Sequence, residues 1–260
     1  MSQNTKHCWV VDLGLVPYLA ACELQRELAE ARKAAAVPDV LLLCEHPHVI
    51  TLGRNGKREH LRASDRLLAQ MNVEFRTTNR GGDITYHGPG QIVGYPILDL
   101  AEHRRDVRWY VEQLEEAMIH ATADFGITGH RVEDKHGVWV DPPADTHYES
   151  RPEARASKDK LAAVGVHLSR WVTSHGFAYN VSTDLRYFDL IVPCGIVGAR
   201  ATSLERILGR GVETVDARTR IISHFGEVFG LPLQAMPLEE FSAMLGRLRN
   251  TTAEAVTTTV

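Results

Sequence analysis

Cys194 is the residue whose type and surroundings best fit a covalent nucleophile. It lies between Pro193 and Gly195, downstream of Lys160. A thiol is mostly protonated at neutral pH, and a nearby cation stabilises the nucleophilic thiolate. The flanking proline and glycine disfavour a regular helix or central strand and suit a tight loop whose N–H groups could hold an oxyanion. Cys194 and Lys160 together predict acyl transfer through Cys194. The alternative is that Cys194 is a buried structural thiol and Lys160 an unrelated, solvated lysine.

A glycine-rich segment, residues 80–91, is the second candidate for a functional element. Its sequence, Arg-Gly-Gly-Asp-Ile-Thr-Tyr-His-Gly-Pro-Gly-Gln, holds four glycines and one proline. This composition predicts an exposed loop whose backbone comes close to a ligand. Arg80, Tyr86 and His87 favour that role over a purely structural turn. The spacing matches neither a P-loop nor a dinucleotide-binding fingerprint, so it predicts no phosphate site.

The elements that must position these residues are a mixture of strands and helices. Periodicity predicts a strand at 8–11 and a helix at 17–36 with Leu19, Cys22 and Leu28 on its apolar face. The apolar runs 40–44 and 49–53 predict two strands joined as a hairpin at Pro47. Further strands are predicted at 73–77, 92–98, 161–166 and 171–181, and helices at 107–125, 215–229 and 237–248. The inward face of helix 107–125 is predicted to hold Val107, Tyr110, Val111, Leu114 and Met118.

The length of 260 residues suits one domain with a well-buried core. We expect a single catalytic domain over residues 1–250, of the α/β class, with mixed sheets and flanking helices. Residues 141–159 are polar and contain prolines, which predicts a mobile insertion. The threonine-rich residues 251–260 predict a frayed tail.

Composition narrows the class of protein. Hydrophobic residues make up 44%, charged residues 24%, and the formal net charge is −4, which is ordinary for a globular protein and disfavours nucleic-acid binding through bulk charge. Arg54, Lys57 and Arg58 form a basic patch that is either a docking surface for an acidic partner or a solvated face. Four cysteines without paired spacing and thirteen scattered histidines predict free thiols and no metal site. The sequence shows no secretion signal and no apolar run long enough to span a membrane, so we expect a cytoplasmic protein that does not bind membranes.

Four ordered segments of this chain resemble the lipoyl(octanoyl) transferase family. They read R-G-G-D-I-T-Y-H-G-P-G-Q at 80–91, K-L-A-A-V-G at 160–165, S-H-G-F-A-Y-N-V at 174–181 and P-C-G at 193–195. The resemblance extends from about residue 40 to residue 203. It implies the α/β architecture that the family shares with biotin and lipoate protein ligases, in a single domain.

The resemblance also implies a reaction and its residues. The family takes an octanoyl group from octanoyl–acyl carrier protein and places it on a lysine of a lipoyl domain, in 2-oxoacid dehydrogenases or the glycine cleavage H protein. The acyl-thioester cysteine falls on Cys194, and the lysine that lowers its pKa falls on Lys160. The substrate-contacting residues fall on Arg80, Gly81, Gly82, Asp83, Ile84, Thr85, Tyr86, His87, Ala163, Val164, Gly165, Gly176, Phe177 and Ala178.

The residue chemistry adds expectations of its own. Thioester exchange followed by amide formation runs without ATP, so we expect no cofactor. The small residues Ala162, Ala163, Gly165, Gly176 and Ala178 are expected to leave room for a flexible acyl chain. His87 and His175 are expected either to form hydrogen bonds around the site or to be ordinary structural histidines, and His46 is more typical of a structural one. We expect a monomer.

Three rival functions remain open from the sequence. An ATP-dependent lipoate–protein ligase shares the fold but needs no cysteine nucleophile, so the retained Cys194 and Lys160 favour the transferase. A binding module for acyl carrier or lipoyl domains would keep the same loops without transfer. A thioesterase would release the acid to water, and no histidine–aspartate pairing with Cys194 is visible to support it.

Overall fold

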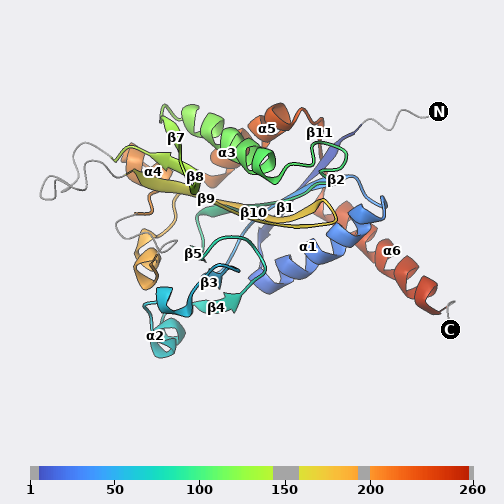
Figure 1. Ribbon diagram of the computed structural model, residues 1–260, viewed down its shortest axis with the longest axis horizontal. Coiled ribbons are helices and arrows are strands. Elements are labelled where there is room, and N and C mark those ends of the chain that lie inside the picture. Colours follow the sequence, from blue (N-terminus) through green and yellow to red (C-terminus); the bar gives the residue numbers. More distant parts are fainter. Residues whose placement is uncertain (1–5, 143–157, 193–199, 258–260) are drawn as a thin grey trace, which may run out of the picture.

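The computed structural model describes residues 6–142, 158–192 and 200–257, and side chains up to Asn250. An eight-stranded mixed sheet forms its centre, and a three-stranded sheet lies beside it (Figure 1). This arrangement confirms the predicted α/β class with mixed sheets and flanking helices. No helix in the described part of the chain is long and apolar enough to span a lipid bilayer.

The large sheet has the strand order β11-β1-β2-β6-β10-β9-β8-β7. Its first three strands are parallel, and every later neighbour pair is antiparallel. The strands are β1 (Cys8–Leu15), β2 (Asp39–Glu45), β6 (Gln91–Ile97), β7 (Gly129–Val132), β8 (Lys135–Val140), β9 (Asp159–Ser169), β10 (Val172–Asn180) and β11 (Leu233–Ala235). The long antiparallel pair β9–β10 therefore brings two of the sequence motifs side by side.

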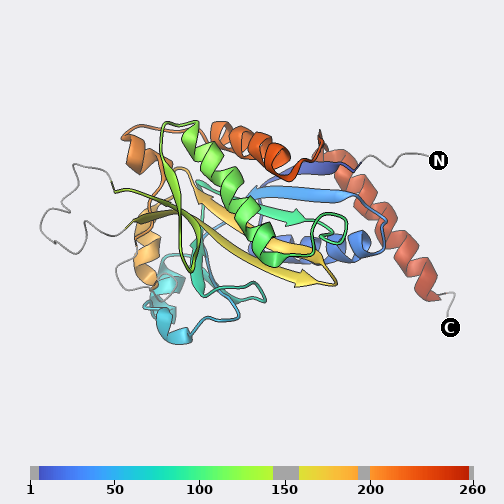
Figure 2. The same ribbon diagram turned by 45° about the horizontal axis from the view of Figure 1, so that its top comes forward.

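Helices cover both faces of this sheet. α3 (Val107–Ala123) and α5 (Thr214–Phe229) lie on one face, and α1 (Tyr18–Lys33) and α6 (Leu238–Thr257) on the other (Figures 1 and 2). Strand β2 shows why, because every second side chain points to the opposite face. Leu41 and Leu43 pack in the α3–α5 cluster, whereas Leu42 packs in the α1–α6 cluster. A strand that is covered on both faces reads as a continuous apolar run.

Capping residues fix where the helices on the α3–α5 face begin and end. The Asp106 carboxylate accepts a hydrogen bond from the Trp109 backbone N–H at 3.0 Å, so α3 begins at the next residue after this cap. Gly230 ends α5 with a φ of +63°, a left-handed conformation that suits glycine. Both helices match their predicted positions, 107–125 and 215–229.

The small sheet has the order β4-β3-β5, with β3 (Val49–Leu52), β4 (Glu74–Thr77) and β5 (Ile84–His87). The predicted hairpin of residues 40–44 and 49–53 is wrong, because β2 and β3 lie in different sheets. β2 is already paired on both edges, with β1 and β6, so it has no edge left for β3. The short helices are η1 (Arg58–His60), α2 (Asp65–Gln70), η4 (Leu185–Leu190) and α4 (Leu204–Leu208).

Two helix faces differ in part from the prediction. In α1 Leu28 is buried as predicted, but Leu19 is 50% exposed. The buried face of α1 consists of Tyr18, Ala21, Gln25, Leu28, Ala29 and Arg32, which includes long polar side chains that an apolar count overlooks. In α3 four of the five predicted inward residues are buried, and Val107 is exposed in the first turn.

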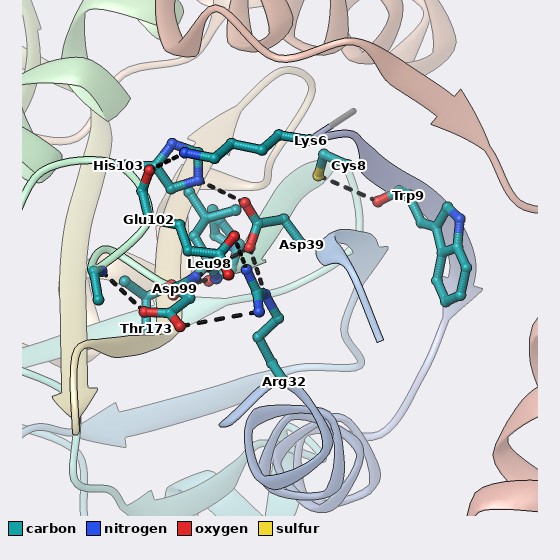
Figure 3. A network of polar contacts seen from close by, with 12 residues as sticks. Lys6, Cys8, Trp9, Arg32, Asp39, Leu98, Asp99, Glu102, His103 and Thr173 are labelled. Carbon is teal, nitrogen blue, oxygen red and sulfur yellow. Dashed lines mark hydrogen bonds and ion pairs between the residues drawn. The ribbon is translucent and has the colours of Figure 1, made fainter. Parts of the chain in front are cut away.

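A buried ionic network ties α1 to the sheet (Figure 3). The Arg32 guanidinium contacts a carboxylate oxygen of Asp39 at 2.8 Å and one of Glu102 at 2.7 Å, and His103 Nε2 lies 2.6 Å from Asp39. Burial opposes the ionisation of Asp39, but the bonds from His103 and Arg32 outweigh it and hold its pKa below the ordinary value. The network fixes the end of α1 against β2 and against the connection from β6 to α3.

The domain boundaries are only partly described. Of the predicted insertion at 141–159, residues 143–157 lie outside the described residues, and Asp159 already belongs to β9. The predicted insertion therefore stays a prediction. The backbone of α6 continues as a helix to Thr257, past residue 250, where a frayed tail was expected.

Candidate active site

A pocket opens between the two sheets, and its walls come from β5, β6, β9 and β10. About 520 Å³ of space, part of it open solvent, lies among these elements. Twelve of the fourteen residues that the resemblance placed at the substrate line it, and Lys160 lies there as well. The twelve are Arg80, Gly82, Asp83, Ile84, Thr85, His87, Ala163, Val164, Gly165, Gly176, Phe177 and Ala178. Segments far apart in the sequence thus form one cavity.

Strand pairing explains how two of the motifs come together. In the antiparallel pair of β9 and β10, Ala163 lies opposite Ala178, and Gly165 lies opposite Gly176. A Cβ on Gly176 would lie 2.2 Å from the carbonyl oxygen of Gly94, and one on Gly165 would lie 2.9 Å from the carbonyl oxygen of Gly81. These glycines therefore serve close backbone approach. The expectation that small residues leave room for the acyl chain stays a prediction.

The inner wall of the pocket combines apolar groups with tyrosines whose hydroxyls are hydrogen-bonded. Val93 and Phe177 are buried apolar residues of this wall. The Tyr95 hydroxyl lies 2.7 Å from His46 Nε2, and the Tyr18 hydroxyl donates to Thr78 Oγ1 at 3.1 Å. Because these hydroxyls are engaged elsewhere, the rings offer mainly apolar surface to the pocket. Such a wall suits a hydrocarbon chain.

Lys160 enters the pocket from β9, and its backbone is held on both sides. Its N–H donates to the Arg200 carbonyl at 2.7 Å, and its carbonyl accepts from the Thr202 N–H at 3.0 Å. Its Nζ lies 5.2 Å from the centre of the Trp139 ring, within the range of a cation–π contact. A Cβ at Gly137, where φ is +125°, would lie 2.9 Å from Lys160 Cε, so the absent side chain gives the lysine its path. The ammonium therefore has a defined place in the pocket.

Arg80 is a buried cation that organises the glycine-rich segment. Its side chain donates to the Thr51 hydroxyl at 3.0 and 3.2 Å, to the Thr51 carbonyl at 2.7 Å and to the Asp83 carbonyl at 2.7 Å. These bonds fasten the turn at residues 80–83 to β3. The segment is not the exposed loop that its composition predicted, because it contains strand β5 and several of its side chains are buried.

The two histidines of the pocket are uncharged at neutral pH. Burial, then nearby His46 and Arg80, lowers the pKa of His87 to about 3. Burial, then Arg80, lowers the pKa of His175 to about 3. His87 Nδ1 lies 2.7 Å from Gln91 Oε1, and His175 Nε2 lies 2.7 Å from Asn79 Oδ1. These side chains can form hydrogen bonds but cannot supply the positive charge that a thiolate needs.

Comparison with known proteins shows the family to which this chain belongs. The model of the lipoyl protein ligase A/B catalytic domain matches residues 17–226. Two curated relatives, both named octanoyltransferase, come from Solibacter usitatus and Caldicellulosiruptor bescii. The first is 48% identical and covers 86% of this chain and 94% of the relative; the second is 42% identical and covers 90% and 96%. This chain belongs to the octanoyltransferase family. It is an acyltransferase.

Solved structures similar to this family member confirm the fold. A lipoate-protein ligase A bound with ATP matches with a TM-score of 0.67 and 14% identity, over 93% of this chain and 94% of the other. The bi-partite lipoate protein ligase from Thermoplasma acidophilum matches with a TM-score of 0.68 and 14% identity, over 93% and 91%. The predicted ligase-like architecture is therefore confirmed.

Some predicted site residues of this octanoyltransferase-family chain lie elsewhere. Cys194 lies outside the described residues, so its distance from Lys160 stays a prediction. Tyr86 and Gly81 are not among the lining residues of the pocket. The Tyr86 ring stacks on Tyr187 at 5.0 Å, and its hydroxyl lies 2.7 Å from His48 Nδ1, in the core of the small sheet.

Sequence reasoning missed several residues of the site. Tyr18, Val93 and Tyr95 line the pocket, and Trp139 lies beneath the ammonium of Lys160. Val93 and Tyr95 stand two residues apart on β6 and thus share a face, so the strand period was the available signal. Nothing local marks Tyr18 or Trp139, because their roles depend on contacts between distant elements.

Two residues of the basic patch contact carboxylates, and one of them, Lys57, lies 3.7 Å from Glu59. Arg58 contacts Asp65 at 2.7 Å and lies 4.3 Å from the Phe75 ring centre. Among the described residues, one group of potential metal ligands lies within 4.8 Å of one another, between α3 and α5 and outside the pocket; it consists of His120, His224 and Glu227. His224 Nε2 already lies 3.0 Å from Asp124 Oδ2, and its Nδ1 lies 3.1 Å from Glu227 Oε2. Docking at the patch stays a prediction.

Proposed function

We propose that this protein transfers an octanoyl group from octanoyl–acyl carrier protein to a specific lysine of lipoyl domains, through a thioester on Cys194. Membership of the octanoyltransferase family supports octanoyl transfer in lipoate biosynthesis. The observation that carries the proposal is the pocket itself, where an apolar wall and the ammonium of Lys160 meet. One part suits the acyl chain, and the other suits a thiolate or an incoming amine.

In the first half-reaction the Cys194 thiolate attacks the thioester carbonyl of the donor. A new carbon–sulfur bond forms to Cys194, and the bond to the carrier sulfur breaks, so the carrier leaves as a thiol after protonation. One thioester replaces another, and the step is close to energetically neutral. Lys160 as an ammonium favours the thiolate before the attack.

In the second half-reaction the acceptor lysine attacks the Cys194 thioester. Its nitrogen forms an amide bond, the carbon–sulfur bond breaks, and the amine proton moves to a base. Lys160 as a neutral amine can take that proton. Because an amide is more stable than a thioester, the step proceeds without ATP. His87 and His175 fit hydrogen-bonding roles beside this chemistry, since both are neutral at pH 7.

The donor and acceptor identities are part of the proposal. Acceptors are the lipoyl domains of 2-oxoacid dehydrogenases and the glycine cleavage H protein, and the enzyme acts as a monomer without a cofactor. Cys8, Cys22 and Cys44 are free thiols, which supports a reducing compartment, and we place the protein in the cytoplasm. An ATP-dependent ligase is the rival that the shared fold allows.

Intact mass spectrometry tests this proposal. The native chain, Cys194→Ala and Lys160→Ala are incubated with octanoyl–acyl carrier protein. Lys158→Ala is the matched control, because Lys158 lies two residues away and pairs with exposed Asp141 at 2.7 Å. We expect one hydroxylamine-labile octanoyl group on the native and Lys158→Ala chains, none on Cys194→Ala, and slow acylation of Lys160→Ala. Labelling of a lipoyl domain only with ATP and free acid would replace the transferase by the ligase.

A further inference from the structure

A chain of hydrogen bonds, joined at one point by the Thr202 backbone, runs from the small sheet to Lys160. It begins at Arg80, whose Nε–H donates to Thr51 Oγ1 at 3.2 Å. The Thr51 hydroxyl lies 3.5 Å from His87 Nε2, and His87 Nδ1 lies 2.7 Å from Gln91 Oε1. These first links join β3, β5 and β6, so they connect the two sheets behind the pocket.

The second half of the chain runs through two buried amide side chains. Gln91 Nε2 donates to Asn180 Oδ1 at 2.8 Å, and Asn180 Nδ2 donates to the Thr202 carbonyl at 2.9 Å. The Thr202 N–H then donates to the Lys160 carbonyl at 3.0 Å, and the Lys160 N–H donates to the Arg200 carbonyl at 2.7 Å. The chain therefore ends on both backbone groups of the pocket lysine.

The chain has a single orientation. Gln91 Nε2 also donates to the Tyr86 carbonyl at 3.2 Å, so both of its amide hydrogens are used and Oε1 must accept. His87 Nδ1 must then carry the hydrogen, which leaves Nε2 to accept from the Thr51 hydroxyl. Reversing the Asn180 amide would set its oxygen against the Thr202 carbonyl and its nitrogen against that of Gln91. The donors from Arg80 to Asn180 all point the same way, towards Thr202, and hydrogen bonds that share a group strengthen one another. The Thr202 carbonyl and N–H belong to different peptide groups, so the last step to Lys160 is a mechanical link through the Thr202 backbone.

Burial makes the chain expensive to break. Thr51 and Thr202 are fully buried, Gln91 is 2% exposed and Asn180 is 4% exposed. A buried donor or acceptor that loses its partner costs more than the bond it made. Breaking any one of these hydrogen bonds would leave an unpaired buried polar group on each side. We therefore expect the residues of the chain to move together rather than one by one.

We propose that Gln91 and Asn180 are positioning residues, which through Thr202 set the place of Lys160 relative to the pocket. The inference rests on the proposed role of Lys160 beside the reacting thiol. The backbone sets where the lysine side chain begins, and Gly137 and Trp139 limit its path from there. A displaced backbone would carry the ammonium away from its place, while the apolar wall for the acyl chain stays intact.

The test replaces Gln91 by methionine, which keeps a similar volume but cannot form the hydrogen bonds. Asn180→Ala is the second variant. Gln234→Met is the matched control, because Gln234 is exposed in β11, at the far edge of the large sheet. The readouts are kcat and KM for octanoyl transfer, the pH profile of the acylation rate, and the thermal midpoint. Amide hydrogen exchange of the native chain reports on the Lys160 and Thr202 N–H groups.

We expect Gln91→Met and Asn180→Ala to lower kcat about tenfold, as the loss of a buried bond permits, with KM for the donor within about twofold. Their acylation profiles shift to higher pH, because the thiol loses a cation that favours its ionised form. Gln234→Met behaves like the native chain. In the native chain the two amides exchange slowly.

Other results overturn the inference in distinguishable ways. If the variants lose only thermal stability and keep the native pH profile and kcat, the chain is structural and positions nothing. If both variants fail to fold, exchange of the native Lys160 and Thr202 amides at the rate of unprotected groups shows that the chain does not hold them. A native protein that forms no octanoyl adduct refutes the proposed function itself.

Discussion

Substituting Gly176 by alanine tests the packing that builds the wall of the pocket. The new Cβ would lie 2.2 Å from the Gly94 carbonyl oxygen and 2.6 Å from Pro96 Cδ. Ordinary contacts of this kind need about 1 Å more, so β10 must move away from β6. Phe177 and Ala178, the next residues of β10, pair with Gly94 and Val93 of β6, and the shift stretches their hydrogen bonds beyond useful length.

The expected cost follows from these two effects. Overpacking costs about 1–3 kcal/mol, and each weakened backbone bond adds roughly 1 kcal/mol. We expect a loss of about 2–4 kcal/mol in the free energy of unfolding, and a fall in the thermal midpoint of about 4–16 °C for a chain of this size. Acylation slows as well, because Gly176 lines the pocket.

Urea denaturation and intact-mass acylation kinetics measure both effects. Gly246→Ala is the matched control, because a Cβ there meets nothing within 4 Å and alanine favours the helix α6. It should be as stable as the native protein or slightly more so. A Gly176→Ala protein with native stability and native acylation would refute the argument that close backbone approach requires glycine here.

Further predictions concern the acyl chain, pH and the ionic network. A hexanoyl donor lacks two methylenes worth about 0.8 kcal/mol each, so it should bind roughly 15-fold more weakly than the octanoyl donor; equal KM values would contradict burial of the chain. Unfolding free energy should fall as pH drops from about 6.5 towards 3, by up to about 1.4 kcal/mol per pH unit for each of His87 and His175, because the unfolded chain binds protons that the folded chain does not. The slope should flatten in His87→Gln and not in exposed His136→Gln. Arg32→Met should cost about 3–5 kcal/mol by leaving the buried Asp39 carboxylate without the guanidinium that contacts it, and a loss below 1 kcal/mol would show that the network contributes little.

The sequence predicted the strands and helices whose pattern is local. Residues 92–98, 107–125 and 215–229 have apolar periods that identify β6, α3 and α5 without reference to anything distant. Which strands pair is not local, and the wrong hairpin shows this. Pro47 suggests a turn between two paired strands. In the structure it lies in the connection from β2 of the large sheet to β3 of the small sheet.

The pocket was predictable only through the motifs. Gly176 carries no signal by itself, but its segment is one of four ordered segments that resemble a family with a known site. Tyr18 and Trp139 escaped because their contact with the pocket depends on how α1 and β8 are placed. The close backbone contacts of Gly165 and Gly176 were not predicted, because they depend on which distant segments approach these strands.

The hydrogen-bond chain from Arg80 to Lys160 was also beyond sequence reasoning. Gln91 and Asn180 lie in two of the motifs, but their amides meet only because β6 and β10 are neighbours in the sheet. Neither composition nor hydrophobic periodicity can identify a hydrogen-bond partner that is distant in the sequence. The structure connects the two amides because both are buried and one donates a hydrogen bond to the other.

The central claim is that a Cys194 thioester is the intermediate of octanoyl transfer, and a chase experiment tests it most directly. The protein is loaded with octanoyl–acyl carrier protein, freed of donor, and mixed with an apo lipoyl domain in the absence of ATP. We predict that the octanoyl mass leaves Cys194 at the rate at which it appears on one lysine of the lipoyl domain, and that this rate accounts for turnover. An adduct that persists while the lipoyl domain stays unmodified, or modification that requires ATP and free acid, would contradict the account.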